Sequence, residues 1–253
     1  MSKFLFYYIV YNKMKAPIGR QGGKSKLKLR LIEMFPKDYD TFVEPFVGAG
    51  NIFYSTPKVE NEIINDKDKD MYIIHKGLQQ YADYIDKNIP RTFTRSRFEK
   101  SKDKSDVINT IYKYKSSFFT MGTSYNPAKD GEKMYTDFSV YGPRLKGVKI
   151  LNQDYSTVIK KYDSPKTFFY LDPPYESSTG KEGVSDYKDF VSPDDVYKSL
   201  QGLKGKFMLS YNDSANIRKI FGKYNIRKIK TKYTGIAREG GVRNKIELII
   251  TNY

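Results

Sequence analysis

The 253-residue chain contains no cysteine, so disulfide bonds, zinc–thiolate sites and cysteine nucleophiles are all excluded. It has one histidine, His75, in the helix-like segment MYIIHKGLQQ. A lone histidine in such a segment is expected to have a surface or packing role rather than a catalytic one. The chemistry of this chain is therefore expected to come from other residue types.

The sequence also lacks a long apolar span. Its first residues, MSKFLFYYIVYNKM, include a short apolar run from Phe4 to Val10. The run is rich in tyrosine, follows a single lysine and has no small-residue cleavage pattern, so we interpret it as a strand or docking segment rather than a signal peptide. We expect no membrane association and an intracellular location, in the cytoplasm or nucleoid of a host, and the gene could be viral.

Acidic residues are scarce beside basic ones. The chain has 45 Lys and Arg against 29 Asp and Glu, a formal net charge of +16. This excess predicts a polyanionic partner, and nucleic acid is favoured over membrane because no basic amphipathic helix accompanies the charge. A basic protein without such a partner is the alternative.

Apolar runs and helical patterns alternate along the chain. Strand-like runs begin at residues 40, 61, 147, 166, 205, 225 and 244, and helical patterns cover residues 24–35, 71–85, 154–162 and 192–203. This alternation predicts an α/β protein with a mostly parallel sheet. Three of the runs end in an acid or an amide, at the sheet edge where open α/β sheets bind ligands.

Residues 91–147 break this alternation and are interpreted as an insertion. Residues 91–149 contain 13 Lys or Arg and 6 Asp or Glu, a difference of +7, interleaved with Tyr and Phe. Such a segment is expected to contact the partner, with a solvated helical cap as the alternative. The predicted organisation is a main domain of residues 1–90 and 148–253 and an inserted domain of residues 91–147.

A first ligand signal lies in TFVEPFVGAGNIFY. Glu44 ends an apolar strand, and Gly48 and Gly50 follow it before a helix expected to begin at Asn51. The next strand ends at Asp66, close to the ~20-residue spacing at which an acid meets ribose hydroxyls in dinucleotide-binding folds. Because Glu44 disfavours a pyrophosphate at this turn, S-adenosylmethionine fits better. The alternative is an ordinary strand-to-helix turn.

A second signal lies in FFYLDPPY, where an apolar run ends at Asp172 and is followed by Pro173, Pro174 and Tyr175. Proline restricts its own backbone and that of the preceding residue, and it donates no hydrogen bond. The acid and the neighbouring carbonyls therefore form a set of acceptors that suits a planar amino group, and Tyr175 offers a face for a base. No metal is required. A loop after a core strand is the alternative.

Taken in order, these motifs resemble a known family. GRQGGKSKL, FVEPFVGAG, NDKDKD, NQDYS, YLDPPY, LSYND and NKIELIITNY are similar to the motifs of Dam-type DNA adenine-N6 methyltransferases of the alpha group. The resemblance covers residues 16–253. It implies a Rossmann-like, S-adenosylmethionine-dependent methyltransferase sheet with a reversed C-terminal hairpin and an inserted target-recognition domain.

The resemblance also implies roles for individual residues. Those that match the family's cofactor-binding positions are Gly22, Gly23, Lys24, Glu44, Phe46, Gly48, Gly50, Asp66, Asp154, Tyr155 and Asp172. The catalytic motif matches Asp172, Pro173, Pro174 and Tyr175. The DNA contacts expected on the insertion are Arg95, Arg97, Lys113, Lys115, Tyr125, Asn126 and Arg144.

Two departures from the family pattern are visible. Arg20, counted with the cofactor-binding residues, stands where many members have an aromatic residue, so stacking there is expected to be replaced by a cation or lost. The segment SYNPAKDGEKMYTDF only partly resembles the recognition hairpin of enzymes that read GATC. The target sequence is therefore not implied.

The expected reaction is transfer of a methyl group from S-adenosylmethionine to N6 of a flipped-out adenine in double-stranded DNA. The alternatives are a cytosine-N4 or RNA amino-methyltransferase and a catalytically silent DNA-binding module. A protein-glutamine methyltransferase is disfavoured because its related motif begins with Asn, where this chain has Asp172. A cognate restriction endonuclease could be a partner, and the chain is expected to be a monomer or a weak dimer.

Overall fold

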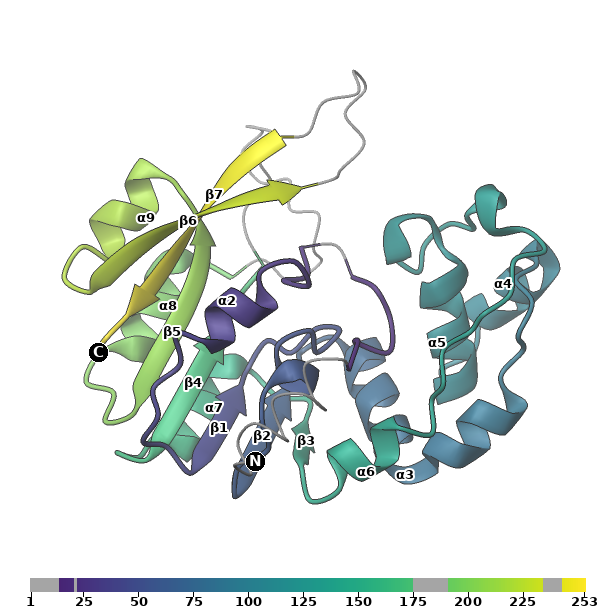
Figure 1. Ribbon diagram of the computed structural model, residues 1–253, viewed down its shortest axis with the longest axis horizontal. Helices are drawn as coiled ribbons and strands as arrows, with labels where there is room; N and C mark the ends of the chain where they lie inside the picture. The colour runs from purple at the N-terminus through teal and green to yellow at the C-terminus, as the bar shows by residue number, and fades with distance from the viewer. Residues whose placement is uncertain (1–13, 21, 175–190, 234–242) are drawn as a thin grey trace, which may run out of the picture. The chain divides into compact units, whose positions relative to one another are not determined.

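The computed structural model describes residues 14–20, 22–174, 191–233 and 243–253 (Figure 1). The chain divides into two compact units, one of Met1–Ile32 and Val47–Gln153 and the other of Glu33–Phe46 and Asp154–Tyr253. No helix among the described residues is long and apolar enough to cross a membrane.

Seven strands form one sheet in the order β3-β2-β1-β4-β5-β7-β6. Their bounds are β1 Thr41–Glu44, β2 Asn61–Asn65, β3 Lys149–Leu151, β4 Thr167–Leu171, β5 Lys206–Asn212, β6 Asn225–Tyr233 and β7 Arg243–Thr251. The pairs β1–β4, β4–β5 and β2–β3 are parallel. Every residue of β4 is buried, as expected for a central parallel strand with a continuous apolar sequence.

The sheet ends in a reversed hairpin. Strand β7 runs antiparallel to β5, with Leu209 opposite Ile250, and β6 runs antiparallel to β7. The described helices of this second unit are α7 (Tyr155–Tyr162), α8 (Pro193–Leu200) and α9 (Ala215–Ile220). Helix α8 packs against α7 and against α9 (Figure 1).

The first unit is built around the long helix α3 (Lys69–Asn88), which Asp68 caps at its N-terminus. The other helices among the described residues of this unit are α2 (Lys28–Ile32), α4 (Arg95–Lys102), α5 (Val107–Ser116) and α6 (Tyr141–Leu145), with short 3₁₀ turns η1 (Phe53–Ser55), η2 (Phe118–Thr120) and η3 (Pro127–Lys129). Helix α5 packs against α3 and α4, and α6 packs against α3 (Figure 1). The predicted insertion thus contributes to the packing of this unit.

The predicted fold class is confirmed: the molecule has an α/β fold with a mostly parallel sheet and a reversed C-terminal hairpin. One local prediction was wrong. The helix expected from Asn51 is only the 3₁₀ turn η1, and the chain becomes extended at Thr56. Pro57 explains the difference, because the residue before a proline is disfavoured in the helical region.

Candidate active site

After β1 the chain turns sharply through a glycine loop, residues 47–51. Gly48 and Gly50 have φ angles of +50° and +81°, in the left-handed region that glycine adopts without steric cost. A Cβ atom on Gly50 would lie 2.7 Å from the ring of Tyr54. The N–H of Val47 donates to the carbonyl of Asn65 at 2.9 Å. Both glycines are therefore required by the shape of the turn.

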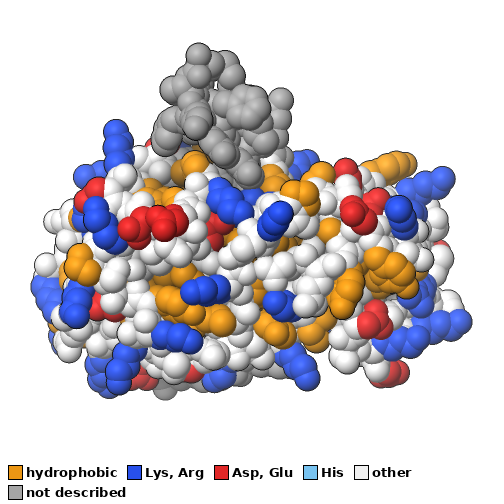
Figure 2. Space-filling model, turned by 90° about the horizontal axis from the view of Figure 1, so that it is seen from below, with side chains coloured by type: hydrophobic (Ala, Val, Ile, Leu, Met, Phe, Trp, Pro, Cys, Tyr) orange, Lys and Arg blue, Asp and Glu red, His pale blue; other side chains and the backbone are white. Residues whose placement is uncertain are grey.

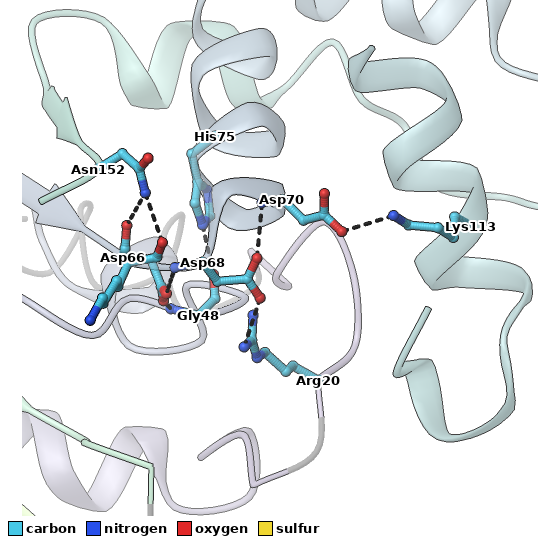
Figure 3. Close-up of polar contacts among 9 residues, drawn as sticks. Arg20, Gly48, Asp66, Asp68, Asp70, His75, Lys113 and Asn152 are labelled. Carbon is cyan, nitrogen blue, oxygen red and sulfur yellow. Dashed lines mark hydrogen bonds and ion pairs between the residues drawn. The ribbon is translucent and has the colours of Figure 1, made fainter. Parts of the chain in front are cut away.

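Asp66 follows β2 and fixes this loop. Its Oδ2 accepts a hydrogen bond from the Gly48 N–H at 2.7 Å, and its Oδ1 accepts one from the Asp68 N–H at 2.9 Å (Figure 3). Burial raises the pKa of Asp66, while the positive charge of Arg20 and the two N–H donors oppose that shift. The Asn152 side chain donates to the Asp66 carbonyl at 2.8 Å. The carboxylate and the glycine loop are thus one rigid arrangement.

Arg20, which replaces the family's usual aromatic residue, is anchored by an ion pair. Its Nη2 lies 3.0 Å from Oδ2 of Asp68, the N-cap of α3 (Figure 3). Its Cδ lies 3.6 Å from the position that a Cβ on Gly48 would take. The Arg20 side chain therefore lies against the glycine loop, and Asp68 holds its guanidinium.

The glycine–lysine motif lies close to the same loop. Gly22 has a φ of +77°, and a Cβ on Gly23 would come within 2.6 Å of the Asn51 amide nitrogen. Lys24 is buried, and its Nζ lies 3.4 Å from the Gly22 carbonyl. The structure therefore brings together the predicted cofactor residues Arg20, Gly22, Gly23, Lys24, Gly48, Gly50 and Asp66, all of which belong to the first unit.

His75, whose expected role was surface or packing, is fully buried on α3. Its Nε2 lies 2.8 Å from the Gly48 carbonyl oxygen (Figure 3). Its Nδ1 lies 2.9 Å from the Tyr54 hydroxyl. Burial lowers its pKa to about 4, so the imidazole is neutral at ordinary pH. The signal that sequence reasoning missed is the position of His75 nine residues after Asp66, on the helix that follows the glycine loop's acid.

In the second unit, Asp172 directly follows β4. Its Oδ1 accepts a hydrogen bond from the Ser210 hydroxyl at 2.9 Å. Strands β4 and β5 are parallel, with Leu171 opposite Leu209, so the register brings the next residue of each strand together. Pro173 is buried and Pro174 is partly exposed. Tyr175, the last residue of the predicted catalytic motif, lies outside the described residues.

The end of β4 is rich in acceptors. Burial raises the pKa of Tyr170 well above its usual value, and the negative charges of Asp172, Glu44 and Glu247 raise it further. Glu44 and Glu247 are themselves buried. The phenol is therefore neutral, and three carboxylates lie near enough to act on it. The acceptor set predicted from sequence, Asp172 with the neighbouring backbone carbonyls, stays a prediction.

Phe46 and Tyr155, both predicted from sequence to bind the cofactor, lie in ring contact. Their centroids are 4.9 Å apart and the rings are tilted by 33°. Asp154 is exposed and caps α7, since its Oδ1 accepts from the Ser156 N–H at 2.9 Å. The aromatic pair offers a flat surface, whereas the carboxylate of Asp154 is committed to the helix end.

Four of the predicted DNA contacts make interactions within the insertion itself: Arg95, Arg97, Tyr125 and Asn126. Arg95 lies over the ring of Tyr125, 5.4 Å from the centroid, and Arg97 lies over Tyr112 at 5.8 Å. Tyr125 is buried, and its hydroxyl donates to Asp130 at 2.6 Å. The Asn126 side chain caps η3. Arg95 is exposed, but Tyr125 stabilises the insertion.

The lysines of α5 face the body of the first unit. Lys113 pairs with Asp70 at 2.8 Å (Figure 3), and Lys115 donates to the Pro17 carbonyl at 3.2 Å. Burial lowers the pKa of Lys115 to about 8, with Lys129 and Arg91 adding to the effect. We therefore leave both lysines out of the proposed DNA surface, because their ammonium groups already bind partners within the fold.

Arg144 requires a correction, because it does not lie on a DNA-accessible surface. It is 2% exposed and makes a bidentate ion pair with buried Glu62 at 2.7 and 2.8 Å. Its guanidinium also lies 3.9 Å from the centroid of the Phe53 ring. The net charge counts this arginine, but its partner lies 82 residues earlier in the chain and could not be identified from sequence. Arg144 is a structural residue.

Replacing Arg144 by methionine is expected to lower the free energy of unfolding by about 3–5 kcal/mol, because Glu62 would be left charged and unpaired in the interior. Urea unfolding measures this directly. The double variant R144M/E62L should recover part of the loss. An R144M protein of wild-type stability with weakened DNA binding would instead support the original prediction.

Two exposed phenylalanines were missed by the sequence reasoning. Phe118 and Phe119 lie in η2, immediately after α5, and are 40% and 47% exposed. Phe119 and Thr120 have φ angles of +49° and +56°, which is rare for residues with large or branched side chains. The signal was available in the run SSFFTMG, two aromatic residues between turn formers in a basic segment.

Together, the seven-stranded sheet, the glycine loop with its acid and the Asp-Pro-Pro turn define the class of Rossmann-like methyltransferases. Comparison with known proteins narrows the class. Residues 21–235 match the family described as D12 class N6 adenine-specific DNA methyltransferase. The chain belongs to this family, whose members carry out site-specific methylation of adenine in DNA.

Three relatives resemble the chain over most of their length. Type II methyltransferase M.CviBI of Paramecium bursaria Chlorella virus NC1A is 24% identical over 95% of this chain and 100% of its own. Type II methyltransferase M.MjaIII of Methanocaldococcus jannaschii is 26% identical over 92% of this chain and 96% of its own. Type II methyltransferase M1.LlaDCHI of Lactococcus lactis subsp. cremoris is 24% identical, covering 92% and 93%. The similarity therefore extends well beyond the motifs.

Proposed function

We propose that this chain transfers the methyl group of S-adenosylmethionine to N6 of an adenine flipped out of double-stranded DNA. The observation that carries the proposal is the carboxylate of Asp172 at the end of β4, oriented by the Ser210 hydroxyl at 2.9 Å and followed by two prolines. Family membership identifies adenine as the methylated base and DNA as the polymer. The position of Asp172 beside Ser210 supports the proposed methyl transfer to an amino group.

The residues present fit S-adenosylmethionine. The partly buried Asp66 carboxylate suits ribose hydroxyls, and the glycine loop leaves room where a side chain at Gly48 would stand. Further cofactor-binding residues proposed in the first unit are Arg20, Gly22, Gly23, Lys24 and Gly50, and in the second unit Glu44, Phe46, Asp154, Tyr155 and Asp172. The cofactor supplies an activated methyl group on a sulfonium centre.

Asp172 is proposed to accept a hydrogen bond from the adenine amino group. With both amino hydrogens drawn onto acceptors, one of them Asp172, the nitrogen lone pair turns out of the plane of the base. Pro173 holds the backbone after Asp172 extended, so the neighbouring carbonyl can serve as the second acceptor. The enzyme therefore mainly positions the reacting nitrogen. A strong base is not needed before methyl transfer, and the proton that the methylated nitrogen then loses passes to Asp172 or to water. Tyr175 is proposed to stack on the base.

The insertion, residues 91–147, is proposed to recognise the DNA target. Its helix α4 has the sequence RSRFEKSK, and Arg95, Lys100 and Lys102 are exposed on it. On the face drawn in Figure 2, Lys and Arg side chains are spread widely rather than gathered in one patch. Contacts of these residues with phosphates would make DNA affinity fall steeply as salt is added.

Phe119 is proposed to help separate the target adenine from its neighbours in the duplex. Its exposed ring sits on a strained backbone, and such strain persists where the surrounding structure enforces it, often at functional sites. An aromatic ring placed between base steps can offset part of the unstacking cost, which is a few kcal/mol.

Phe119→Gly is expected to leave stability unchanged or raise it by about 1 kcal/mol, since glycine accepts a positive φ, while lowering kcat/KM on duplex DNA about tenfold. A substrate with a mismatch opposite the adenine should recover most of that loss. The control is Tyr135→Ala, which removes the insertion's 88% exposed tyrosine. Equal losses on matched and mismatched DNA would contradict the role.

A cognate restriction endonuclease is a proposed partner, because the relatives named above are Type II methyltransferases. Methylation would then protect the recognition site of that endonuclease. We propose that the chain acts as a monomer or weak dimer, in the compartment that holds the DNA.

The test is transfer of tritium from labelled S-adenosylmethionine to defined polymers. Duplex DNA containing many sequence contexts should take up label, whereas RNA of the same sequence should not. Label on RNA alone would favour the RNA amino-methyltransferase. Failure to bind S-adenosylhomocysteine would leave a DNA-binding module without catalysis.

A further inference from the structure

We infer that His75 is a positioning residue for the cofactor, acting through the peptide bond between Gly48 and Ala49. The inference rests on the proposed function, because it assigns a task to the glycine loop in binding S-adenosylmethionine. His75 belongs to none of the sequence motifs, and its role follows from its hydrogen-bond partners.

The tautomer of His75 follows from its partners. The Gly48 carbonyl can only accept, so the proton must be on Nε2, which lies 2.8 Å from it. Nδ1 is then unprotonated and accepts from the Tyr54 hydroxyl at 2.9 Å. Both ring nitrogens are used, and the residue is fully buried. The charged group that bears on the ring is Arg20, whose positive charge further disfavours a second proton.

The Gly48 residue is held at both of its backbone groups. Its N–H donates to the Asp66 carboxylate at 2.7 Å, and its carbonyl accepts from His75. The residue has a φ of +50°, and glycine exchanges between backbone regions at little cost. Two fixed partners therefore select one conformation among several that glycine allows.

Fixing the Gly48 carbonyl also fixes the next N–H. In a planar trans peptide the C=O and the following N–H point in opposite directions. Because the carbonyl points toward the imidazole, the N–H of Ala49 points away from it. His75 thus determines the direction of a backbone donor in the loop, on the side opposite the buried helix α3.

Tyr54 and His75 also support the second glycine. A Cβ on Gly50 would lie 2.7 Å from the Tyr54 ring and 3.3 Å from Cε1 of His75. The Tyr54 N–H donates to the Gly50 carbonyl at 2.9 Å. The two rings pack against the glycine loop. Removal of the imidazole would therefore allow the peptide after Gly48 to rotate.

The test measures binding of S-adenosylhomocysteine to the cofactor-free protein by calorimetry, for His75→Leu, His75→Gln and wild type. His75→Leu is expected to raise the Kd about 10- to 100-fold. His75→Gln, whose side-chain amide can donate to the Gly48 carbonyl, should recover part of the affinity. At saturating cofactor, kcat should stay within about threefold of wild type while KM for the cofactor follows the Kd.

The matched control is Ile85→Ala, which removes buried apolar contacts from the same helix α3 without touching the loop. It should lower the melting temperature while leaving the Kd unchanged. Equal loss of cofactor affinity in Ile85→Ala and His75→Leu would overturn the inference, as would wild-type affinity in a folded His75→Leu protein. Wild-type protein that bound no cofactor product would overturn the proposed function instead.

A spectroscopic measurement addresses the tautomer independently. Because His75 is the single histidine of the chain, ¹⁵N-histidine labelling gives one imidazole signal set. The protonated nitrogen should be Nε2 from pH 8 to pH 5.5 in wild type. A ring that titrated near pH 6.5, or one protonated at Nδ1, would overturn the assignment.

Discussion

Asp172→Ala is expected to lower the rate of methyl transfer to DNA by at least 10³-fold, about 4 kcal/mol of transition-state stabilisation. The variant removes the acceptor that orients the adenine amino group, whereas the cofactor still supplies its methyl group. The Ser210 hydroxyl is buried and loses this acceptor, which costs about 1–3 kcal/mol, so circular dichroism should accompany the assay to show that the fold is retained. Single-turnover kinetics at saturating cofactor and DNA measure the chemical step.

The control for this variant is Asp213→Ala. Asp213 follows the neighbouring strand β5, as Asp172 follows β4. It forms ion pairs with Arg218 and Lys228, so its role is structural. Its removal should change the rate by less than about threefold. An Asp172→Ala protein that methylated DNA at the wild-type rate would refute the catalytic assignment.

Asp66→Ala is expected to abolish measurable cofactor binding. The carboxylate accepts two backbone N–H groups, from Gly48 and Asp68, and hydrogen bonds to a charged group contribute about 1.5–3 kcal/mol each. Those two bonds hold the loop in the free protein as well; the carboxylate's further bonds to the ribose hydroxyls exist only in the bound state, and their loss, about 4 kcal/mol, corresponds to a weakening of about 10³-fold. Calorimetry with S-adenosylhomocysteine measures the change.

Asp163→Ala provides the comparison. Asp163 likewise accepts backbone N–H groups, from Lys204 and Gly205 at 3.0 and 2.9 Å, but it lies in the connection before β4 and matches no motif. It should lose stability without losing cofactor affinity. If Asp66→Ala bound the cofactor product as tightly as Asp163→Ala does, the ribose role of Asp66 would be wrong.

The sheet could be predicted from sequence because each strand carries its own local signal. Strand β4 reads as an uninterrupted apolar run and is buried throughout, and the reversed hairpin follows from the order of the last two runs. The motif acids Asp66 and Asp172 were identifiable because they end such runs. The partner of Asp66 is Gly48 in the glycine loop, and the partner of Asp172 is Ser210 on the neighbouring strand β5.

The charged residues of the insertion could not be assigned in the same way. The sequence does not show whether a lysine or arginine contacts a phosphate or an acid inside the protein. That acid can lie far away in the chain. Asp70 is 43 residues from Lys113, and Glu62 is 82 residues from Arg144. Net charge therefore predicted a polyanionic partner, while the identity of the contacting residues required the fold.

His75 shows a similar limit. Its helix was predicted, but a single imidazole in a helical pattern gives no indication of which nitrogen donates or to what. The network through Gly48 and Tyr54 depends on the turn of the glycine loop, where two positive φ angles bring the carbonyl to the helix. The glycine loop could be identified from sequence, whereas the contact of His75 with the Gly48 carbonyl could be identified only from the fold.

The identity of the methylated base decides whether this chain transfers methyl groups to N6 of adenine. Duplex DNA incubated with the purified chain and S-adenosylmethionine bearing a deuterated methyl group would be hydrolysed to nucleosides and analysed by mass spectrometry. Wild type is expected to yield deuterated N6-methyldeoxyadenosine, and Asp172→Ala is expected to yield none. Deuterated N4-methyldeoxycytidine, or no labelled nucleoside from a protein that binds both cofactor and DNA, would contradict this expectation.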